Sequence, residues 1–487
     1  MNGYAEAKLM PRRITQSDQA LALLYHARAA TPFFSQGGEP CASIPSSVDS
    51  RRVLPLRSAD FRDWLTANYY AEYETAPSSV ALRAALRTLE ARAQAGSAAA
   101  QKVDTRVSFE GDPFAPSKIF LDLANEAGEI LEITSQGWRV TDNLRHTFRQ
   151  APGMLPLPIP AGRQSPAADP GLFFSTLFRL SPQAWTRALF FLASSMRPSG
   201  PYPILVLRGP ASSGKSTLAR ALRMLIDPSS APLRRLPASD RELAHRAQHN
   251  WVLVFDHVHR IPIKICEALC AISSGEGIET TQTDFRDPAV AEIARPMVLI
   301  APLDEAQAPF TAPRSLANRS IAMDLAAIEA PRTEAAVMAD FEALRAPMLA
   351  MLADGASAAL RNIRDIDLAH VTRLPDSTAW VAAAAPALGL APEAIVEAVS
   401  DPDAVWLGTD PLREAVYALL GPSASWTGNS ASLLTSLRTL APQATLPGSP
   451  KALGQALGRV PGISVSRDGQ ILKIAKIAIQ SATSPNP

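Results

Sequence analysis

A glycine-rich segment at the centre of the chain carries the residue types that bind phosphate. It reads Arg208-Gly209-Pro210-Ala211-Ser212-Ser213-Gly214-Lys215-Ser216-Thr217 and fits the spacing Gly-x-x-x-x-Gly-Lys-Ser/Thr. Glycines at both ends allow a turn that directs successive backbone N–H groups toward phosphate oxygens. The Lys215 ammonium can neutralise the β- and γ-phosphates of a nucleotide, and the Ser216 hydroxyl can bind Mg²⁺. Residues 209–217 are therefore predicted to form a P-loop that binds ATP and Mg²⁺.

The neighbouring residues predict the strand and the helix that a P-loop connects. An apolar run over residues 202–207 precedes the loop and is typical of a buried parallel strand. After the loop, the apolar residues of 217–226 recur at helical spacing. Because the motif requires strand, loop and helix in this order, a chance glycine-rich loop is the weaker interpretation.

A second apolar run, over residues 250–255, ends at Asp256. Parallel strands of one sheet deliver the residues at their carboxyl ends to the same edge. A carboxylate at that edge can hold the water shell of Mg²⁺ next to Ser216. The pattern predicts a Walker B strand in which Asp256 acts as a metal-binding and catalytic residue together with Lys215.

A third candidate, Arg319, stands directly before the apolar run of residues 320–325, which predicts the last strand of the sheet. An arginine there can face the nucleotide of a neighbouring subunit and stabilise the transition-state charge. We expect this catalytic role for Arg319, with Arg314 as the second choice. The alternative is an ordinary surface arginine.

The end of the chain predicts three helices and then a β-hairpin that turns at Asp468-Gly469. This succession is typical of a winged helix, a variant of the helix-turn-helix. The third helix and the hairpin carry the candidate DNA contacts Lys451, Gln455, Arg459, Arg467 and Lys473. Winged helices also bind proteins, which is the alternative.

A further candidate DNA contact is Arg286, which follows a segment of β-forming residues at 278–283. A hairpin at this point could present Arg286 to a phosphate backbone. An ordinary solvent-facing hairpin is an equal alternative.

Changes of pattern divide the chain into five segments and indicate a multidomain α/β protein. Residues 1–150 predict an N-terminal α+β accessory domain, and residues 151–180 a proline-rich linker. Residues 181–330 predict the P-loop ATPase core with its parallel sheet. Residues 331–400 predict a helical lid, and residues 401–480 the winged-helix-like domain.

The composition limits the classes of protein to which the chain can belong. Its 47 Lys and Arg against 46 Asp and Glu give a net charge of +1, so DNA binding would depend on local patches. Three cysteines without clustered histidines do not complete a zinc site. The N-terminus lacks the apolar core of a secretory signal, and no apolar run reaches the roughly 20 residues that cross a bilayer. We expect a cytoplasmic protein with no membrane association.

Several stretches together resemble a family of P-loop ATPases from phages, plasmids and integrative elements, described as DNA primase/helicase proteins. They are residues 201–207, the P-loop, and residues 226–234, 251–256, 267–270, 295–296 and 318–321, with 56–62, 137–140 and 153–158 before the core. The resemblance implies a superfamily 3 or AAA+-type motor that assembles into a ring, with a hexamer expected. It also implies translocation on single-stranded or forked DNA. Because no primase cluster is apparent in the sequence, a separate primase is an expected partner.

Two positions depart from that family's pattern. The family carries Asn after the Walker B acid, and many related motors carry a catalytic Glu, but here His257 follows. At the end of the next predicted strand the family has a polar residue, whereas this chain has Ile300 and Ala301. Without these groups the attacking water is less well oriented, so slow hydrolysis is expected. His257 or His259 could position the water instead.

Two functions therefore fit the sequence. The first is an ATP-dependent, helicase-like DNA motor that acts in the replication of a phage or mobile element. The alternative is a nucleotide-gated DNA-binding or regulatory ATPase with little or no hydrolysis, which the two departures favour. A small-molecule kinase would share the P-loop, but the predicted lid and winged helix argue against it.

Overall fold

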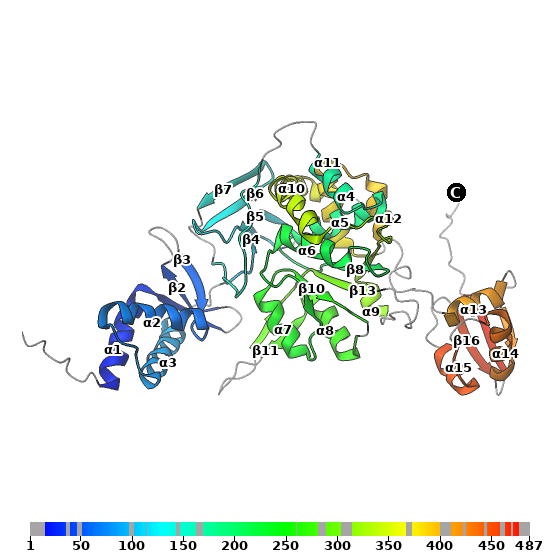
Figure 1. Ribbon diagram of the computed structural model, residues 1–487, viewed down its shortest axis with the longest axis horizontal. Helices are drawn as coiled ribbons and strands as arrows, with labels where there is room; N and C mark the ends of the chain where they lie inside the picture. The colour runs from blue at the N-terminus through cyan, green and yellow to red at the C-terminus, as the bar shows by residue number, and fades with distance from the viewer. Residues whose placement is uncertain are drawn as a thin grey trace, which may run out of the picture. The chain divides into compact units, whose positions relative to one another are not determined.

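The computed structural model describes residues 15–35, 39–45, 51–96, 102–113, 115–142, 147–161, 169–259, 261–280, 289–302, 314–366, 373–399, 411–421, 425–442, 446–457, 463–468 and 471–476. Contacts divide the chain into two compact units. The first comprises Met1–Pro302 and Pro313–Asp401, and the second comprises Leu303–Ala312 and Pro402–Pro487 (Figure 1).

A five-stranded parallel sheet forms the centre of the first unit, with the strand order β14-β8-β13-β10-β9. Its strands are β8 (Ile204–Gly209), β9 (Arg234–Arg235), β10 (Leu253–Asp256), β13 (Met297–Pro302) and β14 (Ser320–Asp324). Every residue of β8 is buried, as expected for a central strand that is covered on both faces. This sheet confirms the predicted multidomain α/β architecture.

Further helices follow from residue 170 onward, and some of them pack against this sheet. They are α4 (Pro170–Leu177), α5 (Pro182–Ser195), α6 (Lys215–Ile226), α7 (Asp240–His249), α8 (Ile263–Ser274), α9 (Arg314–Ala317), α10 (Glu334–Asn362), α11 (Pro375–Leu388) and α12 (Pro392–Val399). Helix α10 packs against α4, α6 and α11 (Figure 1). Within the predicted linker, α4 begins at an Asp169 cap and buries Phe174. Between α8 and β13, a hairpin pairs β11 (Gly277–Thr280) with β12 (Ala289–Glu292).

An antiparallel four-stranded sheet precedes the parallel one in the chain. It contains β4 (Val107–Gly111), β5 (Pro116–Asp122), β6 (Glu129–Thr134) and β7 (Gly137–Asp142) in sequential order. The alternating pattern of the sequence predicts each of these strands. Apolar side chains of this sheet, such as Ile119 and Leu131, belong to the same hydrophobic core as those of β8 and α10.

The N-terminal residues form a separate core of helices and strands. Helices α1 (Gln16–His26), α2 (Ala59–Tyr73) and α3 (Ser79–Gly96) pack around the antiparallel strands β1 (Thr31–Phe34), β2 (Pro40–Pro45) and β3 (Arg51–Pro55), with the 3₁₀ turn η1 (Ala27–Ala29) after α1. Apolar residues at helical spacing indicate these helices, but residues 31–55 lack the alternating pattern that predicts strands. Proline begins or ends two of these strands, and proline is tolerated at strand ends.

The second unit contains three helices and a three-stranded antiparallel sheet. The elements are α13 (Pro411–Leu420), β15 (Ser425–Gly428), α14 (Ser430–Leu440), α15 (Pro450–Leu457), β16 (Ile463–Asp468) and β17 (Ile471–Lys476). The hairpin of β16 and β17 is extended by β15, which the sequence does not predict. Across both units, none of the described helices has the length and apolar character that crossing a membrane requires.

Candidate functional site

The glycine-rich loop runs from the carboxyl end of β8 to the first residue of α6. A Cβ atom on Gly209 would lie 2.5 Å from the carbonyl oxygen of Leu325 and 2.7 Å from the Ser213 hydroxyl oxygen. Gly214 has a φ of +77° and precedes the helix, a conformation that glycine adopts without steric cost. Gly209 is therefore favoured by a close backbone approach, and Gly214 by a left-handed backbone conformation.

The loop presents a series of unsatisfied backbone donors. In the described part of the chain, no acceptor is hydrogen-bonded to the backbone N–H groups of residues 211–217. The last of these groups belong to the first turn of α6, where the helix dipole adds positive potential. Adjacent free N–H groups at a helix N-terminus form an anion-binding arrangement. The loop therefore fits a phosphate group.

Lys215 supplies a charged group to the same loop. Its Nζ donates to the carbonyl oxygens of Gly209, at 2.8 Å, and Pro210, at 2.5 Å, and to Ser213 Oγ, at 3.1 Å. The residue as a whole is 8% exposed. Burial lowers the pKa of the ammonium, and the nearby Asp256 carboxylate partly opposes this shift. The ammonium is thus held within the loop that carries the free N–H groups.

Ser216 and Asp256 meet although β13 separates β8 from β10 in the sheet. The Ser216 hydroxyl donates to Asp256 Oδ2 at 2.9 Å, and the backbone N–H of His257 donates to Oδ1 at 2.7 Å. A hydroxyl oxygen and a carboxylate oxygen suit Mg²⁺, which usually binds one or two protein groups and completes its shell with water and substrate phosphates. Within the described ranges, no group of three or more His, Cys, Asp or Glu side chains forms a metal site.

The two departures from the expected pattern lie next to this pair. His257 is exposed with a φ of +57°, and its ring lies nearly parallel to that of His259, with 6.5 Å between centroids. Ile300 and Ala301, at the end of β13, are 1% and 2% exposed. Neither of these two apolar side chains can orient a water molecule.

Arg319 lies at the other end of the sheet. Ser320, the first residue of β14, is in register with Ile204, the first residue of β8, whereas the loop begins at Gly209. Five residues of a parallel strand span about 16 Å. Arg319 Nε donates to Ser274 Oγ at 2.8 Å, and Nη2 lies 3.7 Å from a carboxylate oxygen of Glu276. The structure does not bring Arg319 to the glycine-rich loop of its own chain.

The structure describes the side chains of only two of the predicted DNA contacts. Lys451, on α15, and Lys473, on β17, have exposed side chains. Gln455 lies in α15 and Arg467 in β16, but their side chains are outside the described part of the structure, as is that of Arg314 in α9. Arg286 and Arg459 lie outside the described residues.

One pair at the candidate site was missed in the sequence. Arg208, just before the loop, forms a bidentate ion pair with Asp324 at the end of β14, with distances of 2.7 and 2.6 Å. The backbone N–H of Leu325 then donates to the carbonyl oxygen of Arg208 at 2.8 Å. The sequence signal that could have revealed Asp324 is its position at the end of an apolar run, which it shares with Asp256. This pair fixes the end of β14 against the loop.

Residues 176–396 match a protein family described as actinomycete integrative conjugative element replication protein. The match confirms the predicted kinship with replication proteins of mobile elements. No curated protein matches the chain in sequence.

Two solved structures are similar over most of the chain. The SCCmec type IV Cch active helicase has 13% identity and a TM-score of 0.43, with 92% of this chain and 93% of that chain covered. The apo form of the NrS-1 C-terminal region has 11% identity and a TM-score of 0.40, with 96% and 100% covered.

Proposed function

Since residues 176–396 match the family described as actinomycete integrative conjugative element replication protein, we propose that this chain is an ATP-driven, helicase-like DNA motor of a mobile element. The observation that carries the proposal is the contact of Ser216 Oγ with Asp256 Oδ2 at 2.9 Å. This contact connects the loop, which carries the free N–H groups, to Asp256 at the carboxyl end of the second parallel strand, β10. Together these parts can bind a magnesium–nucleotide complex.

Each residue of the site has a distinct role in this proposal. The backbone N–H groups of 211–217 hold the β- and γ-phosphates, and Lys215 neutralises their charge. Ser216 and Asp256 would hold Mg²⁺, which supplies charge neutralisation between the phosphates. The Arg208–Asp324 pair keeps the loop in place. Lys215 and Ser216 would exchange their present hydrogen bonds, to the loop and to Asp256, for contacts with the phosphates and Mg²⁺.

Assembly and DNA contact complete the proposed motor. Arg319 lies too far from the P-loop of its own chain, so its catalytic role requires a neighbouring subunit, as in a ring. We assign the AAA+-like core to residues 181–330, the lid to 331–400 and a winged helix to 401–480. Lys451 and Lys473 then offer charges to a DNA backbone.

A second function is favoured by a specific observation. His257 follows the metal-binding acid, and the buried Ile300 and Ala301 end the strand between Asp256 and the loop. With no carboxylate or amide at these positions, the attacking water is poorly oriented. A protein that binds ATP tightly, hydrolyses it slowly and uses it to control assembly or DNA binding is the second candidate.

The test measures ATP binding and ATP hydrolysis, with and without single-stranded DNA, for the wild type and Lys215→Ala. The motor predicts hydrolysis that DNA stimulates and that the variant loses. Lys264→Ala is the matched control, because Lys264 is an exposed lysine of α8. ATP binding without hydrolysis in the wild type, with or without DNA, would reject the motor and favour nucleotide gating. Absence of ATP binding would reject both functions.

A further inference from the structure

The short edge strand β9 places Arg235 beside the acid of the candidate site. Arg235 is the register partner of Asp256 in the parallel pairing of β9 with β10. Neighbouring strands lie about 4.8 Å apart, and paired residues project from the same face of the sheet. The backbone of Arg235 therefore lies on the side of Asp256 that is opposite to the P-loop.

A comparison with the other edge of the sheet shows what is unusual about this pair. Arg208 and Asp324 are also register partners, and they form a bidentate ion pair. Arg235 and Asp256 do not. The two oxygens of Asp256 accept from Ser216 Oγ and the His257 N–H, and the described residues provide the exposed Arg235 guanidinium with no acceptor.

The backbone at Arg235 is nevertheless fixed. Arg246 Nη1, on α7, donates to the Arg235 carbonyl oxygen at 2.7 Å, and Arg246 is also paired with Glu242 one helical turn away. A rigid backbone that presents an unpaired guanidinium suits ligand binding, because only the side chain must be ordered when the ligand arrives. The planar guanidinium matches phosphate oxygens with two parallel hydrogen bonds.

We propose that Arg235 binds the terminal phosphate of the nucleotide and makes the site selective for a triphosphate over a diphosphate. The inference rests on the proposed nucleotide binding and adds a second cation to it. Lys215 approaches the phosphates from the loop, whereas Arg235 approaches from the β9 edge, beyond Asp256. Its charge offsets the repulsion between the Asp256 carboxylate and the γ-phosphate. A diphosphate has no group at that position, so it gains nothing from Arg235.

The experiment measures the dissociation constants of ATP and ADP by displacement of a fluorescent ATP analogue in the presence of Mg²⁺. The variants are Arg235→Ala, Arg235→Lys and the control Arg92→Ala, an exposed arginine of α3. We expect Arg235→Ala to weaken ATP binding about tenfold and to leave ADP binding unchanged, which corresponds to about 1.4 kcal/mol. Arg235→Lys should restore part of the loss, because the charge remains without the forked geometry.

The outcomes separate this inference from the function on which it rests. If Arg235→Ala weakens ATP and ADP equally, or changes neither, the inference is wrong while nucleotide binding stands. If the wild type binds neither nucleotide, both are wrong. Equal urea midpoints for the wild type and Arg235→Ala show that the variant folds, so a selective loss of ATP affinity supports a phosphate contact.

Discussion

At Gly209, one additional side-chain atom would disturb the backbone of the candidate site. A Cβ at this position would meet the Leu325 carbonyl oxygen at 2.5 Å, and that backbone is held by its own hydrogen bond to Arg208. Since neither backbone can yield freely, Gly209→Ala should destabilise the fold by about 1–3 kcal/mol. It should also weaken ATP binding, because the loop shifts.

Urea unfolding and ATP titration of Gly209→Ala measure these two effects. Gly448→Ala is the matched control, because a Cβ at Gly448 meets nothing within 4 Å. Unchanged stability and ATP affinity in Gly209→Ala would contradict the close approach.

The Ser216 hydroxyl should matter for metal-dependent binding only. Its Oγ contacts Asp256 Oδ2, the other proposed oxygen for Mg²⁺, so Ser216→Ala removes a metal-binding group without touching the backbone donors of the loop. We expect the gain in ATP affinity caused by Mg²⁺ to fall about tenfold, a loss of about 1.4 kcal/mol. ATP titrations with Mg²⁺ and with excess EDTA measure it. An equal loss in both conditions would indicate a general loop defect instead.

Residue spacing predicted the positions of the glycine-rich loop and of Asp256 because both signals are local. The glycine positions correspond to backbone conformations of the same loop, and Asp256 directly ends its apolar strand. The residues that lie opposite Arg208 and Arg235 on the neighbouring strands could not be predicted in this way. They depend on which strands are neighbours and in which register, and β9 is only two residues long. In a strand of that length no hydrophobic period can reveal the register.

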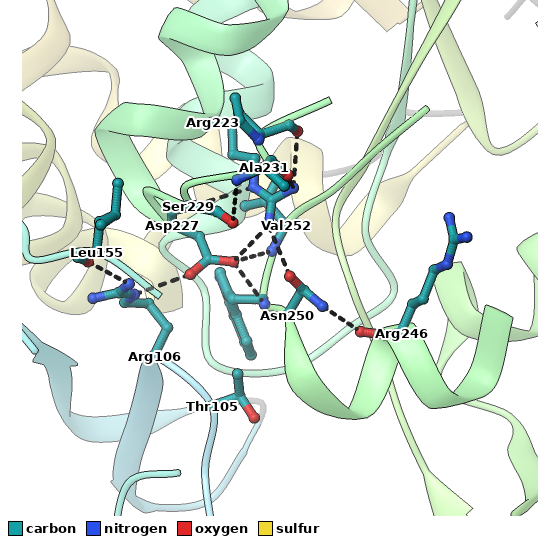
Figure 2. A network of polar contacts seen from close by, with 12 residues as sticks. Thr105, Arg106, Leu155, Arg223, Asp227, Ser229, Ala231, Arg246, Asn250 and Val252 are labelled. Atoms are coloured by element: carbon teal, nitrogen blue, oxygen red, sulfur yellow. Dashed lines mark hydrogen bonds and ion pairs between the residues drawn. The ribbon is translucent and has the colours of Figure 1, made fainter. Parts of the chain in front are cut away.

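At the scale of elements, a buried polar network joins three parts of the fold (Figure 2). Arg106, beside β4, donates to Asp227 Oδ1 at 3.1 Å, and Asp227 Oδ2 accepts from the backbone N–H groups of Trp251 and Val252 at 2.9 and 3.1 Å. Arg223, at the end of α6, donates to Asn250 Oδ1 at 2.8 Å. The network thus connects the antiparallel sheet, helix α6 and the start of the strand that carries Asp256.

Removing the carboxylate of this network should be costly. The side chains of Arg106 and Asp227 are 0% and 4% exposed, and Asp227→Asn leaves the arginine charge buried without its partner. Breaking such a pair from one side typically costs about 3–5 kcal/mol. The free energy of unfolding in urea measures the loss.

The control for this prediction is Asp340→Asn. Asp340 pairs with Arg332, but their side chains are 55% and 44% exposed, so about 0–1 kcal/mol is expected. Similar losses of unfolding free energy in Asp227→Asn and Asp340→Asn would show that burial does not make the Arg106–Asp227 pair more important for stability than an exposed pair.

His249, the last residue of α7, should make the stability depend on pH. Burial, with a further contribution from Arg149, lowers its pKa to about 4 from its ordinary value near 6.5. Its Nδ1 lies 2.8 Å from the His245 carbonyl oxygen and its Nε2 lies 3.1 Å from Arg149 Nη1, so the neutral ring donates to the first and accepts from the second. A proton on Nε2 would remove the acceptor that Arg149 uses.

The direction of the pH effect follows from proton binding. Between pH 6.5 and pH 4 the unfolded chain binds a proton at His249 that the folded chain does not, so stability falls as the pH is lowered through this range. His249→Gln keeps an acceptor for Arg149 and abolishes the titration. Between pH 8 and pH 5, the wild type should lose more unfolding free energy in urea than His249→Gln. Equal losses would contradict the shifted pKa.

The elements themselves were predictable where one periodicity dominates. The strands β4 to β7 alternate, and α6 repeats its apolar residues at helical spacing, so both were expected from the sequence. Strands β1 to β3 were not. They are short and contain Pro32, Pro40, Pro45 and Pro55, and pairing with the neighbouring strand rather than an alternating pattern makes them strands. Helix α4 was hidden within a proline-rich segment, although Pro170 is favourable at a helix start.

At the scale of the whole molecule, the proposed catalytic role of Arg319 requires a second subunit. Arg319 lies at the amino end of β14, and the loop lies at the carboxyl end of β8, about 16 Å away. An arginine that acts on a nucleotide must therefore reach that of another subunit, since in its own chain the sheet lies between them. Ser274 Oγ accepts from Arg319 Nε and holds the side chain at that edge.

A mixture of two inactive variants tests this arrangement. Lys215→Ala subunits lack a working loop but keep Arg319, whereas Arg319→Ala subunits keep the loop. In a mixed ring, some Arg319→Ala sites face an intact Arg319 of a Lys215→Ala neighbour, so DNA-stimulated ATP hydrolysis should reappear. The control mixes Lys215→Ala with Lys215→Ala/Arg319→Ala, in which no site has a working loop. Size-exclusion chromatography with a non-hydrolysable ATP analogue confirms assembly. Assembled mixtures that remain inactive would mean that Arg319 does not act across subunits, and a simple packing role at the end of α8 would then explain its contacts.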